Sequence, residues 1–257
     1  MANTNLLLQC LLGMQCKDFA IIAADQLNTQ SVVIMKNDVD KIFELSDKLL
    51  LGVNGDAGDM AQFTQYIAQN LQLYEMKNKY QLAPAAVVHF TRKNMTDALR
   101  SGNPTILNML FASYDEETGS QLYTMDFLAS CVNVPYASHG IGGLLGISIL
   151  DNYYRPTLSE LEAYEVIKLC IYEIQHRLFM NLPNFKVKTV SKDGIKTLPV
   201  INTATFVNKS LLSYGYCTKC KMNESLSRTL NRRRAVTRCA TTYIHSHTEP
   251  SEQWRLK

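Results

Sequence analysis

The stretch LQCLLGMQCKDFAIIAA (residues 8–24) contains two apolar runs separated by the short polar turn Cys16-Lys17-Asp18. Both runs, 8–15 and 19–24, are apolar at successive positions, so each would present apolar side chains on both of its faces. Strands of this kind belong to a sheet that is covered on each side. The stretch therefore predicts a pair of central strands in a layered fold.

The rest of the chain, up to about residue 206, alternates between groups of strands and pairs of helices. Helices are indicated by apolar residues at three- and four-residue spacing, as in Met60, Phe63, Ile67, Leu71 and Tyr74. The expected elements are strands at 31–36, 41–45 and 49–54, helices around 60–74 and 83–99, strands at 105–114 and 121–127, helices at 140–154 and from Pro156 onward, and a closing hairpin at 185–198.

This order of elements predicts the fold class. Strands that are apolar on both faces, combined with two pairs of helices, suggest two sheets stacked between two helix layers. We therefore expect an α+β protein built as a four-layer αββα sandwich. Ser159 and Glu162 have the spacing of a capping box and are expected to begin the last helix.

Composition divides the chain into two parts. Of its 257 residues, 46% are hydrophobic and 19% charged, which is typical of a globular protein. The net charge of +3 is unevenly distributed, because residues 207–257 carry +7 and the remainder carries −4. We therefore expect one domain at 1–206, followed by a basic C-terminal extension at 207–257 that has too few apolar residues to fold and is disordered.

The sequence also argues against membrane insertion and secretion. No apolar run approaches the ~20 residues that a membrane span needs. The N-terminus has no positively charged segment of the kind that opens a secretory signal. Cysteines are scattered and lie mostly among apolar residues, which is typical of buried thiols in a reduced compartment.

Many short motifs resemble those of one known family, in register from about Leu8 to about Ala204. They include Leu12-Gly13-Met14-Gln15, Ile22-Ala23-Ala24-Asp25, Gly55-Asp56-Ala57-Gly58-Asp59, Phe90-Thr91-Arg92-Lys93-Asn94, Ser148-Ile149-Leu150-Asp151 and Asn181-Leu182-Pro183. The family is that of the β subunits of the 20S proteasome, in the N-terminal-nucleophile (Ntn) hydrolase superfamily, and the similarity is to its type-4 class, also called beta type-2.

The resemblance implies a place in a large assembly. The chain would occupy one position in each heptameric β ring and contact other α and β subunits of the stacked-ring core particle. It would complete the chamber used in ubiquitin-dependent protein degradation, in the cytoplasm and nucleus, and it would need no cofactor.

The resemblance also implies that this chain is not itself an enzyme. Active family members use an N-terminal threonine, whose hydroxyl attacks and whose amine is the base. Leu8 stands at that position and has no nucleophile. Asp25, Lys41 and Gly55 match remaining site residues, Gly55 being the oxyanion-hole glycine, whereas Gly143 stands in place of a supporting serine. We expect Asp25 and Lys41 to persist as a structural pair.

The C-terminal extension offers only weak motifs. Cys217, Cys220, Cys239, His245 and His247 could ligate zinc, but a single CxxC followed by loosely spaced ligands is a poor signal, and we expect no metal. Arg232-Arg233-Arg234 could bind nucleic acid or direct nuclear import. A solvated charge run in a disordered segment is the simpler interpretation.

Three alternative functions remain open at this stage. The chain could be an active threonine-type peptidase, against which Leu8 argues. It could be a nucleic-acid-binding protein that acts through its basic extension, in which case binding would weaken steeply with salt. It could also be a diverged, tissue-restricted paralogue with an altered partner.

Overall fold

The computed structural model describes residues 9–30 and 33–206, which form two five-stranded sheets and four helices. One sheet has the strand order β10-β1-β2-β11-β12 and the other has the order β5-β6-β7-β8-β9. The strands are β1 (Leu11–Gln15), β2 (Phe19–Asp25), β5 (Ile42–Ser46), β6 (Leu49–Gly55), β7 (Leu107–Asp115), β8 (Gly119–Met125), β9 (Cys131–Asn133), β10 (Tyr136–His139), β11 (Asn184–Ser191) and β12 (Gly194–Asn202). A small hairpin, β3 (Asn28–Gln30) with β4 (Val33–Lys36), stands apart from both sheets.

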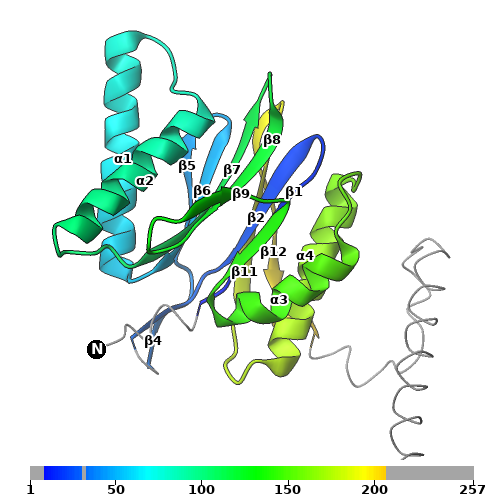
Figure 1. The fold of residues 1–257 in the computed structure, drawn as a ribbon. Coiled ribbons are helices and arrows are strands. Elements are labelled where there is room, and N and C mark those ends of the chain that lie inside the picture. The colour runs from blue at the N-terminus through cyan, green and yellow to red at the C-terminus, as the bar shows by residue number, and fades with distance from the viewer. Residues whose placement is uncertain (1–8, 31–32, 207–257) are drawn as a thin grey trace, which may run out of the picture. The chain divides into compact units, whose positions relative to one another are not determined.

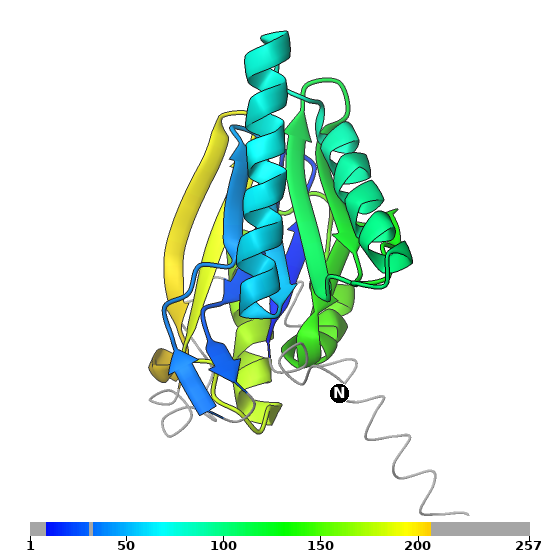
Figure 2. The ribbon, with the colours of Figure 1, turned by 90° about the vertical axis from the view of Figure 1, so that its left-hand side faces the viewer.

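The four helices cover the outer faces of the two sheets. Figure 1 shows α1 (Ala57–Asn78) and α2 (Pro84–Arg100) against the sheet of β5 to β9. On the opposite side, α3 (Gly140–Tyr153) and α4 (Glu160–Arg177) cover the sheet that contains β1 and β2. Figure 2 gives the view onto the side of α1 and α2. The predicted αββα sandwich, the fold of the Ntn hydrolases, is therefore confirmed.

Alternation along the central strands sorts the buried side chains into three apolar layers. In β2, Ile21 and Ala23 pack with the layer beneath α3 and α4, whereas Ala20 and Ile22 face the other sheet. The strands β6 and β7 divide their side chains in the same way between the helix side and the inter-sheet layer. Successive strand residues point to opposite faces, so a strand that is buried on both faces needs apolar residues at successive positions. The runs 8–15 and 19–24 have this pattern.

Local signals begin the two longest helices. The Asp56 side chain accepts a hydrogen bond from the Gly58 amide at 3.0 Å and caps α1. Ser159 and Glu162 form the predicted capping box at the start of α4, in which the Ser159 amide donates to Glu162 at 3.0 Å. Such caps satisfy amides that have no partner within the helix.

The structure differs from the sequence expectations mainly in its short strands. The strand expected at 31–36 is β4, and its partner β3 was not anticipated. Two strands of the main sheets, β9 and β10, were also missed. They are three and four residues long, and each is held by its place at a sheet edge rather than by an apolar pattern of its own. The extension predicted at 207–257 lies outside the described residues.

Two expectations from the sequence, that of buried thiols and that of no membrane span, can be compared with the described part of the chain. Cys10, Cys16 and Cys170 are buried free thiols, and Cys131 is half-buried. Among the described helices, none combines the length and the apolar character needed to cross a lipid bilayer.

Candidate functional site

A buried ion pair joins the two sheets near the start of β1. Asp25 ends β2, and Lys41 directly precedes β5 in the other sheet. Lys41 Nζ lies 2.7 Å from Asp25 Oδ2, and both side chains are only 1% exposed. The two residues predicted from the family resemblance to share a site are therefore in direct contact.

The Asp25 carboxylate also holds the neighbouring backbone. Its Oδ1 accepts a hydrogen bond from the Cys10 amide at 2.7 Å, and its Oδ2 accepts one from the Leu27 amide at 3.0 Å. In return, the Asp25 amide donates to the Cys10 carbonyl at 3.0 Å. Three donors therefore converge on a single buried carboxylate, which compensates for its loss of hydration.

The expected oxyanion-hole glycine already has a partner within the chain. The Gly55 amide donates to Gln9 Oε1 at 2.8 Å, and Gln9 Nε2 donates to the Gly55 carbonyl at 2.9 Å. Gln9 is 2% exposed. The N–H and the C=O of Gly55 are thus both hydrogen-bonded to the buried Gln9 side chain, which takes the place that a neighbouring strand would have.

The N-terminus of α3 closes the site from the other side. Gly140 has a φ of +79°, and a Cβ atom there would lie 2.0 Å from the Gln9 carbonyl oxygen. A Cβ at Gly142 would lie 2.7 Å from that of Cys10, whereas a Cβ at Gly143 would meet Ser138 at 3.0 Å. Gly143, the residue that stands for the supporting serine, therefore faces β10, and Gly142 is the α3 glycine that faces Cys10.

Cys10 lies beside the Asp25–Lys41 pair, and its surroundings suppress the reactivity of its thiol. Burial raises the pKa of the Cys10 thiol well above its usual range, and the Asp25 carboxylate raises it further. A thiol reacts as its thiolate, so Cys10 is held in its unreactive form. The buried Cys10 thiol agrees with the expectation that the cysteines among apolar residues are buried thiols.

His139, at the end of β10, forms a second polar contact, partly buried, beside Gly140. Its Nε2 lies 2.9 Å from Thr124 Oγ1 of β8, so the contact joins the two sheets. Burial lowers the pKa of the His139 ring, with partial compensation from a hydrogen bond to the Met109 backbone and from Asp126. The ring therefore favours its neutral form in the folded protein.

We expect the free energy of unfolding to decrease as the pH falls from about 7 to about 5. In the unfolded chain, His139 takes up a proton near its ordinary pKa of about 6.5. In the folded protein the pKa of His139 is lower, so the ring resists protonation. Acidification therefore favours the unfolded state and lowers the free energy of unfolding. Denaturant unfolding at several pH values measures this slope. His139→Gln should flatten it, whereas His89→Gln, at an exposed position, should leave it unchanged. An equal slope for His139→Gln and the wild type would contradict the conclusion that folding lowers the pKa of His139.

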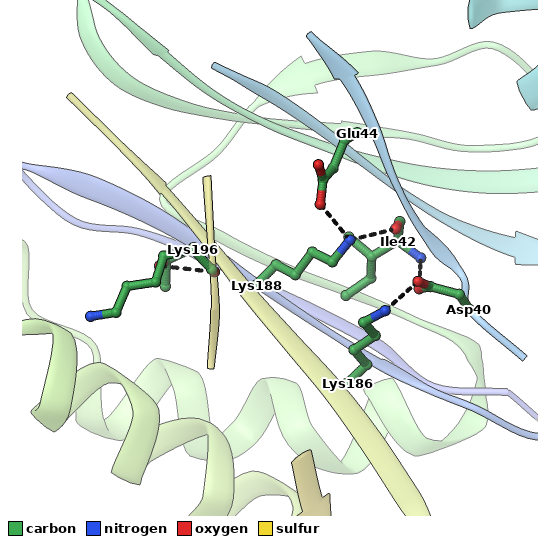
Figure 3. A network of polar contacts seen from close by, with 7 residues as sticks. Asp40, Ile42, Glu44, Lys186, Lys188 and Lys196 are labelled. Carbon is green, nitrogen blue, oxygen red and sulfur yellow. Dashed lines mark hydrogen bonds and ion pairs between the residues drawn. The ribbon is translucent and has the colours of Figure 1, made fainter. Parts of the chain in front are cut away.

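A lysine network on β11 fixes the segment that carries Lys41. Figure 3 shows Lys186 reaching Asp40 and Lys188 reaching Glu44, with Lys188 also directed at the Ile42 carbonyl. The Lys188 to Glu44 distance is 2.8 Å, and Lys188 Nζ lies 3.3 Å from the carbonyl oxygen. These contacts hold residues on either side of Lys41, so β11 positions it against Asp25.

Some sequence predictions fall outside the described residues. They are Leu8 at the nucleophile position, the zinc candidates Cys217, Cys220, Cys239, His245 and His247, and the arginine run 232–234. Within residues 9–30 and 33–206, the structure contains no cluster of three or more His, Cys, Asp or Glu residues that could hold a metal ion. The sequence did not predict a role for Gln9. The one feature that could have indicated it is a polar residue at the start of an otherwise apolar strand.

Comparison with known proteins gives a consistent result. A family model described as "Proteasome subunit" matches residues 9–190. Proteasome subunit beta type-2 of Oryza sativa subsp. japonica is 38% identical over 189 residues, covering 74% of this chain and 89% of that protein. Proteasome subunit beta type-4 of Saccharomyces cerevisiae is 36% identical over 187 residues, covering 72% and 94%. The beta type-2 subunit of Dictyostelium discoideum is 34% identical over 195 residues, covering 75% and 98%.

Proposed function

This chain belongs to the proteasome subunit family, as a β-type member, and from that premise we propose that it is a non-catalytic structural subunit of the 20S core particle. In this role it occupies a position in the β ring and helps to enclose the chamber in which other β subunits cleave proteins delivered by the ubiquitin pathway. Its neighbours are α and β subunits of the same particle, in the cytoplasm and nucleus. The role requires no cofactor.

The observation that carries the non-catalytic role is the pair of hydrogen bonds between Gln9 and Gly55. An oxyanion hole works only if its donors are free to bind the charge that develops on the substrate. Here the Gly55 amide is bound to Gln9 Oε1 at 2.8 Å inside the protein. A substrate carbonyl would have to displace a buried side chain that satisfies both Gly55 groups.

The nucleophile position supports the same proposal. Leu8 precedes Gln9 and offers no hydroxyl or thiol. Cys10, two residues later, is buried, has a raised pKa, and binds Asp25 through its own amide. With its backbone amide inside the chain, Cys10 also has no free amine to act as a base. The Asp25–Lys41 pair then serves to hold the start of β1.

Two measurements on the tagged full-length chain, expressed in cells, test the role. The chain should co-migrate with a particle of several hundred kilodaltons and contain no residue labelled by an epoxyketone inhibitor of threonine proteases. Active β subunits in the same particle provide the positive control for labelling. A stable monomer would refute assembly, and inhibitor attached to any residue of this chain would refute the non-catalytic role.

A further inference from the structure

The end of β6 contains an asparagine followed by a glycine, a dipeptide that is prone to lose its side-chain amide spontaneously. The backbone nitrogen of the glycine can attack Cγ of the asparagine, because glycine has no side chain to hinder the approach. The pair is Asn54-Gly55, which is the one Asn-Gly pair in the sequence. The structure shows why this pair is present and what protects it.

The reaction of such a pair consumes only water. The Gly55 nitrogen forms a bond to Cγ of Asn54, the bond between Cγ and Nδ2 breaks, and ammonia leaves with the proton of the Gly55 amide. Water then opens the resulting five-membered imide at one of its two carbonyl carbons. One opening gives aspartate, and the other gives isoaspartate, in which the main chain runs through the former side chain.

The Asn54 side chain is buried, but no hydrogen bond holds it within the described residues. It is 1% exposed, so the water that the second step consumes is excluded from the folded protein. Neither Oδ1 nor Nδ2 of Asn54 has a hydrogen-bond partner in residues 9–30 and 33–206. A contact of that kind would fix the amide group away from the Gly55 nitrogen. Protection of the pair therefore depends on the backbone.

The glycine of the pair is required by the packing of β6 against β7. A Cβ atom at Gly55 would lie 2.5 Å from Leu107 Cδ2 and 2.6 Å from the Ile106 carbonyl oxygen. Real Cβ atoms essentially never make contacts this short. A side chain at this position would therefore displace β7, and the reactive dipeptide is a consequence of the close approach between the strands.

Gln9 is the contact that holds the Gly55 nitrogen in place. On one side, β6 pairs with β7 as far as Gly55. On the other side, the Val53 amide donates to the Lys41 carbonyl at 2.9 Å. The next amide that points this way is that of Gly55, which donates to Gln9 Oε1 at 2.8 Å. Imide formation turns the Gly55 nitrogen toward the Asn54 side chain, so the bond to Gln9 must break first.

We propose that Asn54-Gly55 is a latent deamidation site and that Gln9 keeps it closed. While Gln9 holds the Gly55 nitrogen, residue 54 remains an asparagine. When Gln9 separates from β6, the pair cyclises and water converts it to aspartate and isoaspartate. This inference concerns the chemistry of the chain itself and is independent of the subunit role proposed above.

Conversion to isoaspartate would be irreversible in its effect on the fold. The additional backbone carbon of isoaspartate shifts the alternation of side chains in β6 from that point onward. Gly55 would then no longer meet both Gln9 and β7. The pair thus leaves a permanent chemical mark on chains that remain open at this site.

Peptide mapping of the purified full-length chain by mass spectrometry tests whether the site exists. The folded wild type and the same chain in guanidinium chloride are incubated at neutral pH, and aspartate and isoaspartate at position 54 are quantified. Conversion should be slower in the folded chain by about tenfold or more, because the reaction requires a buried segment to open. Equal rates in the two conditions, or no conversion in the unfolded chain, would overturn the proposal.

Gln9→Met tests the role of Gln9 at nearly constant side-chain volume. It removes both hydrogen bonds to Gly55, so conversion in the folded variant should accelerate by about tenfold or more. Gln15→Met is the matched control, because Gln15 donates from β1 to the Ser120 carbonyl at 2.7 Å and does not contact Gly55. It should convert at the wild-type rate. An unchanged rate in Gln9→Met, or an equal rise in Gln15→Met, would contradict the proposal.

Hydrogen exchange keeps the test decisive if Gln9→Met does not fold. In the wild type, at guanidinium concentrations below the unfolding transition, conversion of Asn54 should accelerate in proportion to exchange of the Gly55 amide. Both processes require the bond between Gly55 and Gln9 to open. Conversion that stays constant while the Gly55 amide exchanges faster would show that Gln9 does not protect the site.

Discussion

Lys41→Met is expected to lower the free energy of unfolding by about 3–5 kcal/mol, because it leaves the Asp25 carboxylate buried without its cation. Both side chains of the pair are 1% exposed, so water cannot replace the lost partner. Methionine has approximately the volume of lysine, so the substitution leaves no large cavity. The decrease in the free energy of unfolding therefore comes from removing the positive charge and its hydrogen bond to Asp25. Denaturant unfolding of the full chain measures the change.

Lys186→Met is the matched control for that variant. Lys186 also pairs with an aspartate, Asp40, but the two side chains are 24% and 42% exposed. Surface pairs of this kind contribute about 0–1 kcal/mol.

In cells, Lys41→Met should reduce the yield of assembled particle and leave the peptidase activity per particle unchanged. Normal assembly with reduced activity per particle would instead assign Lys41 a catalytic role.

Gly140→Ala should be the most damaging of the small substitutions near the site. Its φ of +79° costs an L-residue about 1–2 kcal/mol, and the new Cβ would lie 2.0 Å from the Gln9 carbonyl oxygen. Relieving that overlap requires β1 or the start of α3 to move, which adds about 1–3 kcal/mol. The expected loss in the free energy of unfolding is therefore about 2–5 kcal/mol.

Gly102→Ala separates the cost of the positive φ from the cost of the steric overlap with Gln9. Gly102 has a similar φ of +81°, but no atom beyond the glycine and its two chain neighbours lies within 4 Å of the position its Cβ would take. This variant should lose only the conformational cost of about 1–2 kcal/mol. Equal losses at Gly140 and Gly102 in denaturant unfolding would show that the contact between α3 and Gln9 does not constrain the fold.

The parts of the fold that sequence predicted well are those with strong local patterns. The helix stripe from Met60 to Tyr74 and the Ser159–Glu162 capping box are determined by residues three or four positions apart. Residues 8–24 are apolar on both faces, so they indicated a doubly covered sheet without any knowledge of their partners. The start of β1 was placed at Leu8, whereas the described strand begins at Leu11.

The parts that sequence missed depend on contacts between distant residues. Gln9 meets Gly55 across 46 positions, and Thr124 meets His139 from the other sheet. No spacing rule links these residues, because the sheets must stack before they come together. Family resemblance identified Asp25 and Lys41, but it did not indicate that Gln9 occupies the Gly55 amide or that Gly143 faces Ser138.

The position of β11 has a kinetic consequence. This strand lies between β2 and β12, and Phe185 of β11 is opposite Asp25 of β2. During synthesis, β11 leaves the ribosome about 160 residues after β2, which corresponds to roughly ten to thirty seconds at ordinary translation rates. Throughout that interval β2 can pair only with β1, and its other edge remains open. An apolar strand with an open edge is a template for misassociation, so the nascent chain is most vulnerable to aggregation before its last hairpin has been made.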